Sequence, residues 1–172
     1  MRAPDSIAYR TARTYGAHNW PIVPLAWPHR GVCSCREGQN CGSPAKHPLT
    51  KNGVHDASTD PAVITEWFTR WPRANIGIAC GERSGLLVFD VDPRNGGRER
   101  FQAFIERYGL IPATPKVATG GGGWHYYFAY EGPAFPKDWG NGLDLLGDGR
   151  IAVAPYSEHV SGRRYRWEVR PW

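Results

Sequence analysis

An unbroken apolar run, Leu86–Phe89, ends in two acidic residues, Asp90 and Asp92. Four consecutive apolar residues bounded by Gly85 and Pro93 predict a short strand that is buried on both faces. Because side chains alternate along a strand, Asp90 and Asp92 are expected on the same face of it. Two carboxylates on one face repel each other unless a proton or a cation lies between them. The pattern therefore indicates a site for divalent cations, and a turn capped by the two carboxylates is the structural alternative.

Length and composition limit the class of protein. A chain of 172 residues is long enough for one domain with its own core, and 41% hydrophobic residues with 22% charged residues argue against wholesale disorder. No apolar stretch approaches the length of a membrane span, and residues 1–13 lack the apolar core of a signal peptide. We therefore expect a cytoplasmic protein without a membrane partner. The net charge of +5 favours a polyanionic partner.

Three of the four cysteines lie close together, and a histidine follows them: Cys33, Cys35, Cys41 and His47. In a cytoplasmic protein such clustering favours metal binding over disulfides. Three thiolates and one imidazole complete the tetrahedral set of a structural zinc site. The sequence therefore predicts a Zn²⁺ site in a loop over residues 31–48, with a reduced loop free of metal as the alternative. Cys80 lies in an apolar strand pattern and is expected in the core.

Apolar residues recur at helical spacing in three segments and form short runs in others. Helices are expected over residues 6–15, 60–71 and 98–108, and strands over 21–26, 75–81, 86–89, 114–119, 151–154 and 165–169. Asp60 and Pro61 suit the N-cap and first position of the second helix, and Gly16 suits the end of the first. Two prolines in residues 21–26 indicate an edge strand. The tight turn over residues 82–85 predicts that the strands on either side of it pair as a hairpin.

Four successive glycines, Gly120–Gly123, follow Thr119. Glycines without side chains expose backbone N–H groups and allow close approach of a phosphate. The aromatic run after them predicts a strand with His125 at its start. A histidine beside a glycine-rich loop could donate a hydrogen bond to a triphosphate, whereas a structural histidine with its partner in the core is the alternative.

Two further segments carry charged residues in unusual settings. Asp144 lies among leucines in a predicted core strand, where a carboxylate needs a partner such as a shared metal ion. Asp148 lies in a Gly-Asp-Gly turn, where Asp is common for local reasons, so it is the weaker candidate. The last strand combines Arg163, Arg164 and Arg166 with Trp167. Basic residues interleaved with aromatics suit single-stranded nucleic acid, and a solvated edge strand is the alternative.

Taken in order, these segments resemble the primase-polymerase (Prim-Pol) domain of the archaeo-eukaryotic primase superfamily, found in replication proteins of plasmids, phages and integrated elements. The resemblance covers residues 20–167 and lies in the order of the pieces. The matching pieces are Cys33-Ser-Cys35 with Cys41, Lys46-His47-Pro48, Ala74–Ile78, Gly85–Pro93, Thr119–Gly121 with His125, Gly142–Asp144 with Gly147–Gly149, and Val153–Pro155 with Ser157, His159, Gly162 and Tyr165.

The resemblance implies an α+β fold with an RRM-like palm, which is an antiparallel sheet backed by helices, and an N-terminal α/β part. It implies a single catalytic domain over residues 1–172 with the zinc-binding loop 31–48 inserted in it. The implied activity is template-directed nucleotidyl transfer, as a DNA primase, a DNA polymerase or both, by a two-metal mechanism in a plasmid, phage or mobile-element replication system. The implied partners are a single-stranded DNA template and dNTP or NTP, and, in a longer protein, a C-terminal helical domain and a helicase.

The family's functional residues map onto this chain one by one. Asp90, Asp92 and Asp144 match the acids that hold two Mg²⁺ or Mn²⁺ ions, and His125 matches the histidine that contacts the nucleotide's phosphates. The zinc ligands of part of the family match Cys33, Cys35, Cys41 and His47. The implied nucleotide-binding residues are Thr119, Gly120, Gly121, Gly123, His125 and Ser157.

The chain departs from the family's pattern at two of these positions. The second acid is Asp92 where many relatives have Glu, and its shorter side chain would alter the spacing of the metals. Leu146 stands where an Arg is common, two residues after the third acid.

Two other classes of function compete with this assignment. A non-catalytic, zinc-containing module that binds single-stranded nucleic acid would keep the fold without the chemistry. The run Val88–Asp92 also resembles the nucleophile strand of haloacid-dehalogenase-type phosphohydrolases. That family alternates strands with helices after this point, whereas predicted strands dominate here from Lys116 onward.

Overall fold

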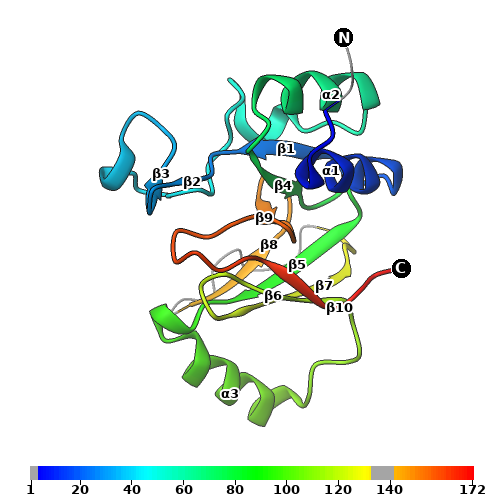
Figure 1. Cartoon of the computed structure of the whole chain (residues 1–172). Helices are drawn as coiled ribbons and strands as arrows, with labels where there is room; N and C mark the ends of the chain where they lie inside the picture. Colours follow the sequence, from blue (N-terminus) through cyan, green and yellow to red (C-terminus); the bar gives the residue numbers. More distant parts are fainter. Residues whose placement is uncertain (1–3, 133–141) are drawn as a thin grey trace.

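The structure, a computed structural model, describes residues 4–132 and 142–172 (Figure 1). Its helices are α1 (Ile7–Ala17), α2 (Pro61–Arg70) and α3 (Gly97–Tyr108), with short 3₁₀ helices η1 (Gly38–Asn40), η2 (Gly53–Asp56) and η3 (Pro93–Asn95). Its strands are β1 (Ile22–Leu25), β2 (Pro28–His29), β3 (Val32–Cys33), β4 (Asn75–Ala79), β5 (Leu86–Val91), β6 (Lys116–Ala118), β7 (Trp124–Ala129), β8 (Leu143–Leu146), β9 (Ile151–Val153) and β10 (Arg166–Val169). None of these helices is long and apolar enough to cross a bilayer.

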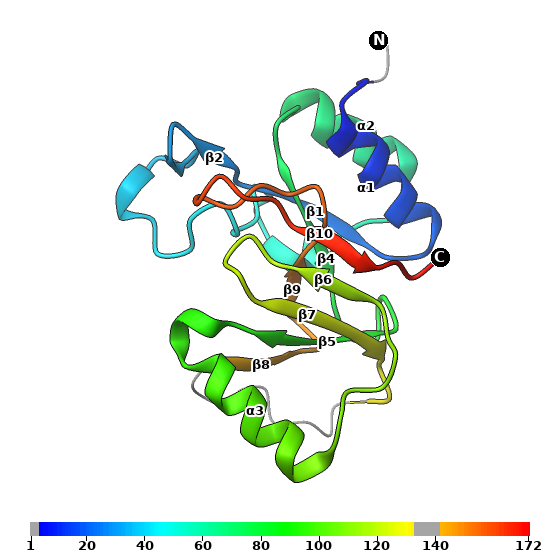
Figure 2. The ribbon, with the colours of Figure 1, turned by 60° about the horizontal axis from the view of Figure 1, so that its bottom comes forward.

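The strands form antiparallel sheets, which gives the chain an α+β fold. A three-stranded sheet has the order β1-β4-β9, a five-stranded sheet has the order β10-β6-β7-β5-β8, and β2 pairs with β3. Helices α1 and α2 lie against the three-stranded sheet, and α3 lies against the far face of the five-stranded sheet (Figures 1 and 2). The two-stranded β2–β3 ribbon projects to one side (Figure 1).

The predicted helix boundaries are confirmed at α2 and adjusted at α1. Asp60 caps α2 by accepting a hydrogen bond from the Ala62 amide at 2.7 Å, and Pro61 is the first helical residue. Helix α1 runs through the predicted stop at Gly16. A Cβ atom at Gly16 would lie 2.9 Å from Cδ1 of Ile64, so this glycine allows α1 to pack closely on α2.

Strand β5 is buried on both faces, as its apolar run predicts. Leu86 and Val88 belong to the larger core, which also contains residues of α1, α2 and the three-stranded sheet. Leu87, Phe89 and Val91 belong to a second core cluster, which contacts apolar residues of α3. The five-stranded sheet is therefore the layer between the two cores.

The hairpin predicted for β4 and β5 is wrong. The two strands share only one bridge, between Gly81 and Leu86, and then each joins a different sheet. β4 pairs instead with β1 and β9, and β5 pairs with β7 and β8. The carboxylate of Asp148 lies at the turn between them and accepts a hydrogen bond from the Glu82 amide at 2.9 Å. A Cβ atom at Gly81 would lie 2.0 Å from the same carboxylate, so Asp148 occupies the space beside the turn. Strand β1 is confirmed as an edge strand of its sheet.

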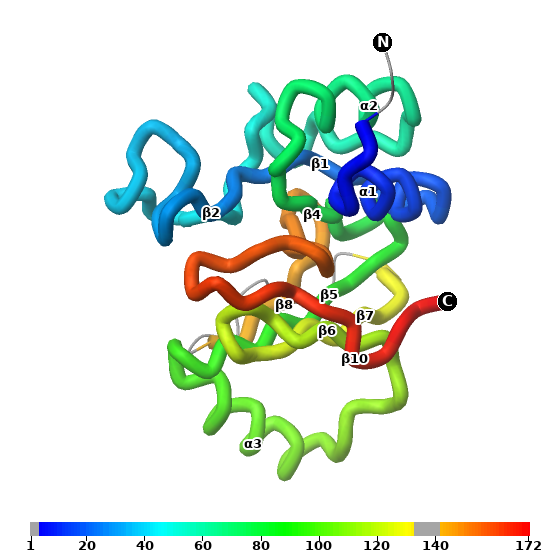
Figure 3. The backbone as a smooth tube through the Cα atoms, viewed as in Figure 1, coloured from blue at the N-terminus to red at the C-terminus, as the bar shows by residue number. Residues whose placement is uncertain are grey.

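Asn75, at the start of β4, joins three segments that are distant in sequence. Its side-chain amide donates to the carbonyl oxygens of Ala45 at 2.9 Å and Glu158 at 2.8 Å, and its side-chain oxygen accepts from the Glu158 amide at 2.8 Å. Only 4% of Asn75 is exposed. The segment after β9 and the segment after β3 consequently lie on the same side of the molecule (Figure 3).

We expect Asn75→Ala to lower the free energy of unfolding by about 2–4 kcal/mol, because it leaves three buried backbone groups without partners. Urea denaturation measures this value. Asn40→Ala is the matched control, since Asn40 is exposed, and it should change stability by less than about 0.5 kcal/mol. Equal effects of the two substitutions would contradict the structural role of Asn75.

Candidate active site

One row of directly opposed residues crosses the five-stranded sheet. From β10 to β8 it consists of Trp167, Val117, His125, Asp90 and Asp144, each the Cα partner of the next. Directly opposed residues on neighbouring strands project from the same face of a sheet. The sheet therefore brings together Asp90, Asp144 and His125, which lie up to 54 residues apart in sequence.

This row lies on the face opposite α3. Val88, Tyr127 and Leu146 are two positions along from Asp90, His125 and Asp144, and all three belong to the larger core. The residues that alternate with them belong to the cluster under α3. The polar row is thus the end of an otherwise apolar face.

His125 is a buried imidazole beside Asp90. Its Nε2 atom lies 3.6 Å from Oδ1 of Asp90, and its side chain is 5% exposed against 28% for Asp90. Burial lowers the pKa of His125 below its ordinary value of 6.5, and the nearby Asp90 opposes this shift. Nδ1 has no hydrogen-bond partner among the described residues. His125 is therefore neutral at pH 7.

Asp92 follows β5 and is held by Arg94. The guanidinium makes two parallel contacts, Nε to Oδ1 at 3.0 Å and Nη2 to Oδ2 at 2.8 Å. The Arg94 amide and the Asn95 side chain donate to the same carboxylate at 3.1 and 3.2 Å. The hydrogen bonds from Arg94 hold the pKa of Asp92 below its usual range. Asp92 is therefore ionised and already has a cationic partner.

The glycine-rich turn is closed by Thr119. Thr119 exchanges backbone and side-chain hydrogen bonds with Gly123 and accepts one from the Gly122 amide. The amides of Gly120 and Gly121 donate to no group among the described residues. Two of the four expected donors are thus used inside the turn, and two remain for a ligand. Gly123 must be small, because its Cβ would lie 1.9 Å from the Val91 carbonyl oxygen.

Three basic residues beside these acids were given no role from the sequence: Lys46, Arg94 and His159. Arg94 Nη1 lies 3.4 Å from His159 Nε2. The charge of Lys46 acts on His125 and His159, adding to the effect of burial in lowering their pKa values. Lys46 and His159 fall within motifs of the family resemblance, and no other feature of the sequence indicates that they belong to the site. Arg94 follows Asp92 by two residues, but no sequence pattern predicts that it turns back onto it.

Ser157 and Asp148 have structural partners. The Ser157 hydroxyl is buried and accepts from the Ile76 amide at 2.9 Å, which holds the 154–165 segment to β4. The nucleotide contact expected of Ser157 remains a prediction. Asp148 accepts hydrogen bonds from the Glu82 amide and from the Tyr130 hydroxyl, at the far end of β5 from Asp90. Its local role agrees with its being the weaker candidate acid.

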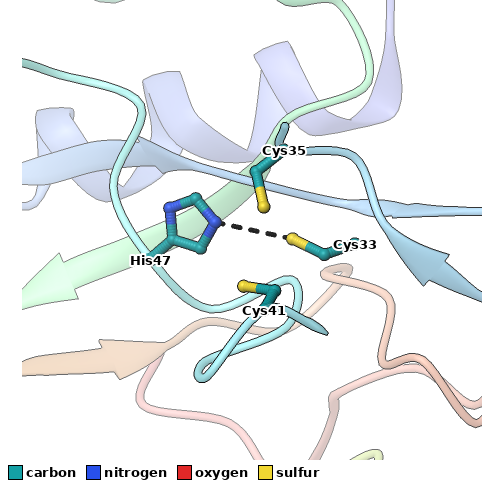
Figure 4. A group of neighbouring side chains, drawn as sticks. All are labelled: Cys33, Cys35, Cys41 and His47. Atoms are coloured by element: carbon teal, nitrogen blue, oxygen red, sulfur yellow. Dashed lines mark hydrogen bonds between the residues drawn. The ribbon is translucent and has the colours of Figure 1, made fainter. Parts of the chain in front are cut away.

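The four expected zinc ligands converge (Figure 4). The ligand atoms of Cys33, Cys35, Cys41 and His47 all lie within 4.8 Å of one another. His47 Nδ1 lies 3.3 Å from the Pro48 carbonyl oxygen, which can only accept, so Nδ1 carries the proton and Nε2 offers its lone pair beside the Cys33 sulfur. Burial raises the pKa of Cys35, but the neighbouring side chains of His47 and Cys33 lower it to about 6. The donor set fits Zn²⁺.

The zinc cluster is linked to the segment that carries His159 by a short chain of hydrogen bonds. The Ala45 amide donates to the Cys33 sulfur at 3.3 Å, and the Ala45 carbonyl accepts from Asn75. Asn75 in turn holds Glu158, the neighbour of His159. The position of Lys46, the residue after Ala45, therefore depends on the loop that carries the cysteines.

A groove of about 410 Å³ runs along the β6–β10 edge, next to the glycine turn. Its lining includes Thr119, Gly122, Gly123, Trp124, Arg163, Arg164 and Arg166. Arg166 of β10, Arg163 and Arg164 just before it, and the glycine turn thus belong to one concave surface, on which Glu168 is the one acidic residue among the described residues. Strand β10 is also an edge strand, so both interpretations of its arginines agree with the structure.

Comparison with known families gives one match. The Prim-Pol family, described as bifunctional DNA primase/polymerase, N-terminal, matches residues 12–171, which is nearly the whole chain. A search of curated proteins found no match. The resemblance seen in the ordered motifs is thereby confirmed.

We expect the purified protein to contain about one Zn²⁺ per chain, measured by mass spectrometry of the metals. Cys35→Ser should lose most of the zinc because it removes one of four ligands. Cys80→Ala is the control, since Cys80 lies in the core away from the cluster, and it should keep the zinc. A protein that binds no zinc after refolding in its presence would contradict this assignment.

Stability should fall as the solution is acidified from about pH 7.5 to about pH 5.5. Burial lowers the pKa of both His125 and His159 below 6.5, so between the folded and unfolded values the unfolded chain binds protons that the folded chain does not. Stability is therefore lost as the pH falls from the pKa of these histidines in the unfolded chain to their lower pKa in the folded chain. Urea denaturation across this range measures it.

The slope of the unfolding free energy against pH should be smaller in His159→Gln. It should be unchanged in His29→Gln, a control at an exposed histidine. Stability that rises on acidification in this window would be the opposite of the expected result.

Proposed function

The chain belongs to the Prim-Pol family of bifunctional DNA primase/polymerases, and from this premise we propose that it is a template-directed nucleotidyltransferase. The observation that carries the proposal is the row Asp144, Asp90 and His125 across β8, β5 and β7. These are the residues that the family resemblance assigns to catalysis. The same resemblance suggests a replication system of a plasmid, phage or mobile element.

The acids fit divalent cations. Asp90 and Asp144 are directly opposed on neighbouring strands, an arrangement that is destabilising for like charges unless a cation lies nearby. Their oxygen donors are those preferred by Mg²⁺ and Mn²⁺. Asp92 would complete the set by giving up a hydrogen bond other than those from the Arg94 guanidinium, such as the one from the Asn95 side chain. When bound, two such ions would lower the pKa of the attacking hydroxyl and stabilise the leaving pyrophosphate.

The chain's own residues position the reactants. His125 is neutral and buried, so its ring can hold a hydrogen bond to a phosphate oxygen or to Asp90 without carrying charge. The free amides of Gly120 and Gly121 would donate to the triphosphate near the acids. Positioning and charge stabilisation of this kind supply most of the catalysis in phosphoryl transfer.

The arginine groove beside the glycine turn suits the single-stranded template. Arg163, Arg164 and Arg166 offer charge to the backbone, and Trp124 offers an aromatic ring for stacking. The zinc cluster has four ligands and no open position, so we assign it a structural role. Its loop ends beside Lys46, whose charge reaches the acids.

We further propose that the five-stranded sheet with α3 is an RRM-like palm. The acids and His125 lie on three neighbouring strands of this sheet, as the resemblance implies. The three-stranded sheet with α1 and α2 would be the N-terminal α/β part. Because the larger core contains residues of both sheets, we regard residues 1–172 as one catalytic domain with the zinc loop 31–48 inserted in it.

The two competing functions have less support. A haloacid-dehalogenase-type phosphohydrolase carries its nucleophile on a parallel sheet with helical crossovers, whereas β5 is central in an antiparallel sheet. A non-catalytic module that binds single strands would have no need of Asp90, Asp144 and His125 in one row. The test below separates this module from the enzyme.

We expect the wild-type protein to incorporate labelled nucleotides on a single-stranded DNA template with Mg²⁺ or Mn²⁺. Asp90→Ala should lower the rate by at least about 10²–10³-fold, because it removes a central charged group of the site. Its zinc content and unfolding free energy should match those of Asp5→Ala, a control at a side chain that is 91% exposed. Parallel reactions with and without a primer distinguish priming from extension.

Full activity in Asp90→Ala would remove the proposed mechanism. A wild-type protein that binds single strands but forms no product in either metal would favour the non-catalytic module.

A further inference from the structure

The tautomer of His159 is fixed by its neighbours. The Ser161 backbone N–H donates to Nδ1 at 3.1 Å. A backbone amide can only donate, so Nδ1 must be the acceptor and the proton must be on Nε2. The Ser161 hydroxyl also lies 3.0 Å from Nδ1, but it donates to the Gly120 carbonyl at 2.9 Å. This assignment rests on hydrogen bonds and leaves Nε2–H as the outward donor of the ring.

That donor faces another donor. Nε2 of His159 lies 3.4 Å from Nη1 of Arg94, and a guanidinium has no acceptor atom. Two N–H groups cannot bond to each other, so each of them can donate to a third group that lies beside both. His159 is only 5% exposed, so bulk water cannot surround its ring. An anionic oxygen between the two groups would accept from both.

Arg94 is held in place for this contact. Its Nε and Nη2 atoms bind Asp92 at 3.0 and 2.8 Å, which leaves the Nη1 side directed toward His159. A bidentate pair fixes the plane of a guanidinium as well as its position. The side chain of Arg94 is 48% exposed, so a ligand can reach it.

The glycine turn lies against both groups. A Cβ atom at Gly121 would lie 3.1 Å from Cζ of Arg94, and one at Gly120 would lie 2.2 Å from Cβ of His159. The amides of these two glycines donate to no group among the described residues. Backbone amides next to a guanidinium and an imidazole N–H form a donor-lined concavity of the kind that binds phosphate.

The charged groups around His159 are mostly positive. After burial, the charges of Lys46, Arg94 and Arg163 lower the pKa of His159, with Asp92 opposing them. A neutral, buried histidine is thus placed near three cations. Their combined charge favours an anion at the point where the His159 and Arg94 donors converge.

We propose that His159 and Arg94, with the amides of Gly120 and Gly121, form a phosphate-binding site next to Asp92. The ligand is a phosphate group, carried either by the triphosphate of a nucleotide or by the backbone of a bound strand. Only the choice of these two sources rests on the proposed function. The donors themselves define a phosphate site whatever reaction the protein catalyses. It gives His159 a role distinct from that of His125.

The first experiment observes His159 directly. In zinc-loaded protein labelled with ¹⁵N-histidine, without added Mg²⁺ or Mn²⁺, the long-range ¹H–¹⁵N spectrum should show His159 as the Nε2–H tautomer, assigned from the signal lost in His159→Gln. Tripolyphosphate should shift this nitrogen and leave that of His29 unchanged. The opposite tautomer, or no shift with either saturating tripolyphosphate or a saturating single-stranded oligonucleotide, would overturn the proposal.

The second experiment measures affinity by calorimetry on the zinc-loaded protein without added Mg²⁺ or Mn²⁺, with tripolyphosphate, dATP, deoxyadenosine and a single-stranded oligonucleotide. Tripolyphosphate or the oligonucleotide should bind, and deoxyadenosine should not. His159→Gln and Arg94→Gln should each weaken phosphate binding about tenfold or more, because each removes a charge-assisted or buried hydrogen bond. Arg94→Lys, which keeps the charge, should weaken it less.

The controls are His29→Gln and Arg150→Gln, which change exposed residues of the same types and should bind as the wild type does. Melting temperature and zinc content confirm that each variant is folded. If the buried His159 variant does not fold, the half-exposed Arg94 variants decide the question.

The arms of the experiment identify the source of the phosphate. If the variants lose affinity only for tripolyphosphate and dATP, the site binds the nucleotide. If they lose affinity only for the oligonucleotide, the site binds the strand. Unchanged affinity for all ligands in folded Arg94→Gln and His159→Gln would overturn the proposal. If the wild type nevertheless synthesises strands, the proposed function stands and only the phosphate site is wrong. If these residues bind phosphate but the wild type synthesises no strand, only the proposed function is contradicted.

Discussion

The buried side-chain amide of Asn75 holds together three parts of the chain that have no local reason to meet. It binds Ala45 at the end of the cysteine-bearing loop and both backbone groups of Glu158, while its own backbone begins β4. A buried amide with all partners satisfied specifies one arrangement, because any other leaves polar groups unpaired. Asn75 thereby ties the segment of Lys46 and the zinc cluster to the segment of His159.

Alternation along three strands decides where the charged residues lie. On β5, β7 and β8 one set of alternate residues faces α3, and the other set faces the larger core and ends in Asp90, His125 and Asp144. A slip of one residue in either pairing would move the acids to the apolar face under α3. The hydrophobic pattern that folds the sheet therefore also fixes the register of the polar row.

The sequence predicts those features that depend on neighbours in the chain. The β5 strand, the Asp60 cap and the spacing of Cys33, Cys35, Cys41 and His47 are local patterns, and the structure agrees with them. The pairing of β4 was mispredicted because its true partners, β1 and β9, lie at least 50 residues away in sequence, where a local turn pattern carries no information. Arg94 and His159 were given no role for the same reason, since their contact links residues separated by 65 positions.

The charges of the site are complementary to a ligand that carries both signs. Asp90 and Asp144 oppose each other across one strand pair, while Lys46, Arg94 and Arg163 surround His159 on the neighbouring side. Arg94 at Asp92 joins the two groups, which partly neutralise each other there. A divalent cation bound to a triphosphate offers positive charge to the acids and phosphate oxygens to the cations at once. Neither ion alone would satisfy both groups, so under the proposed function a metal–nucleotide complex is expected to bind more tightly than a free metal or a free phosphate.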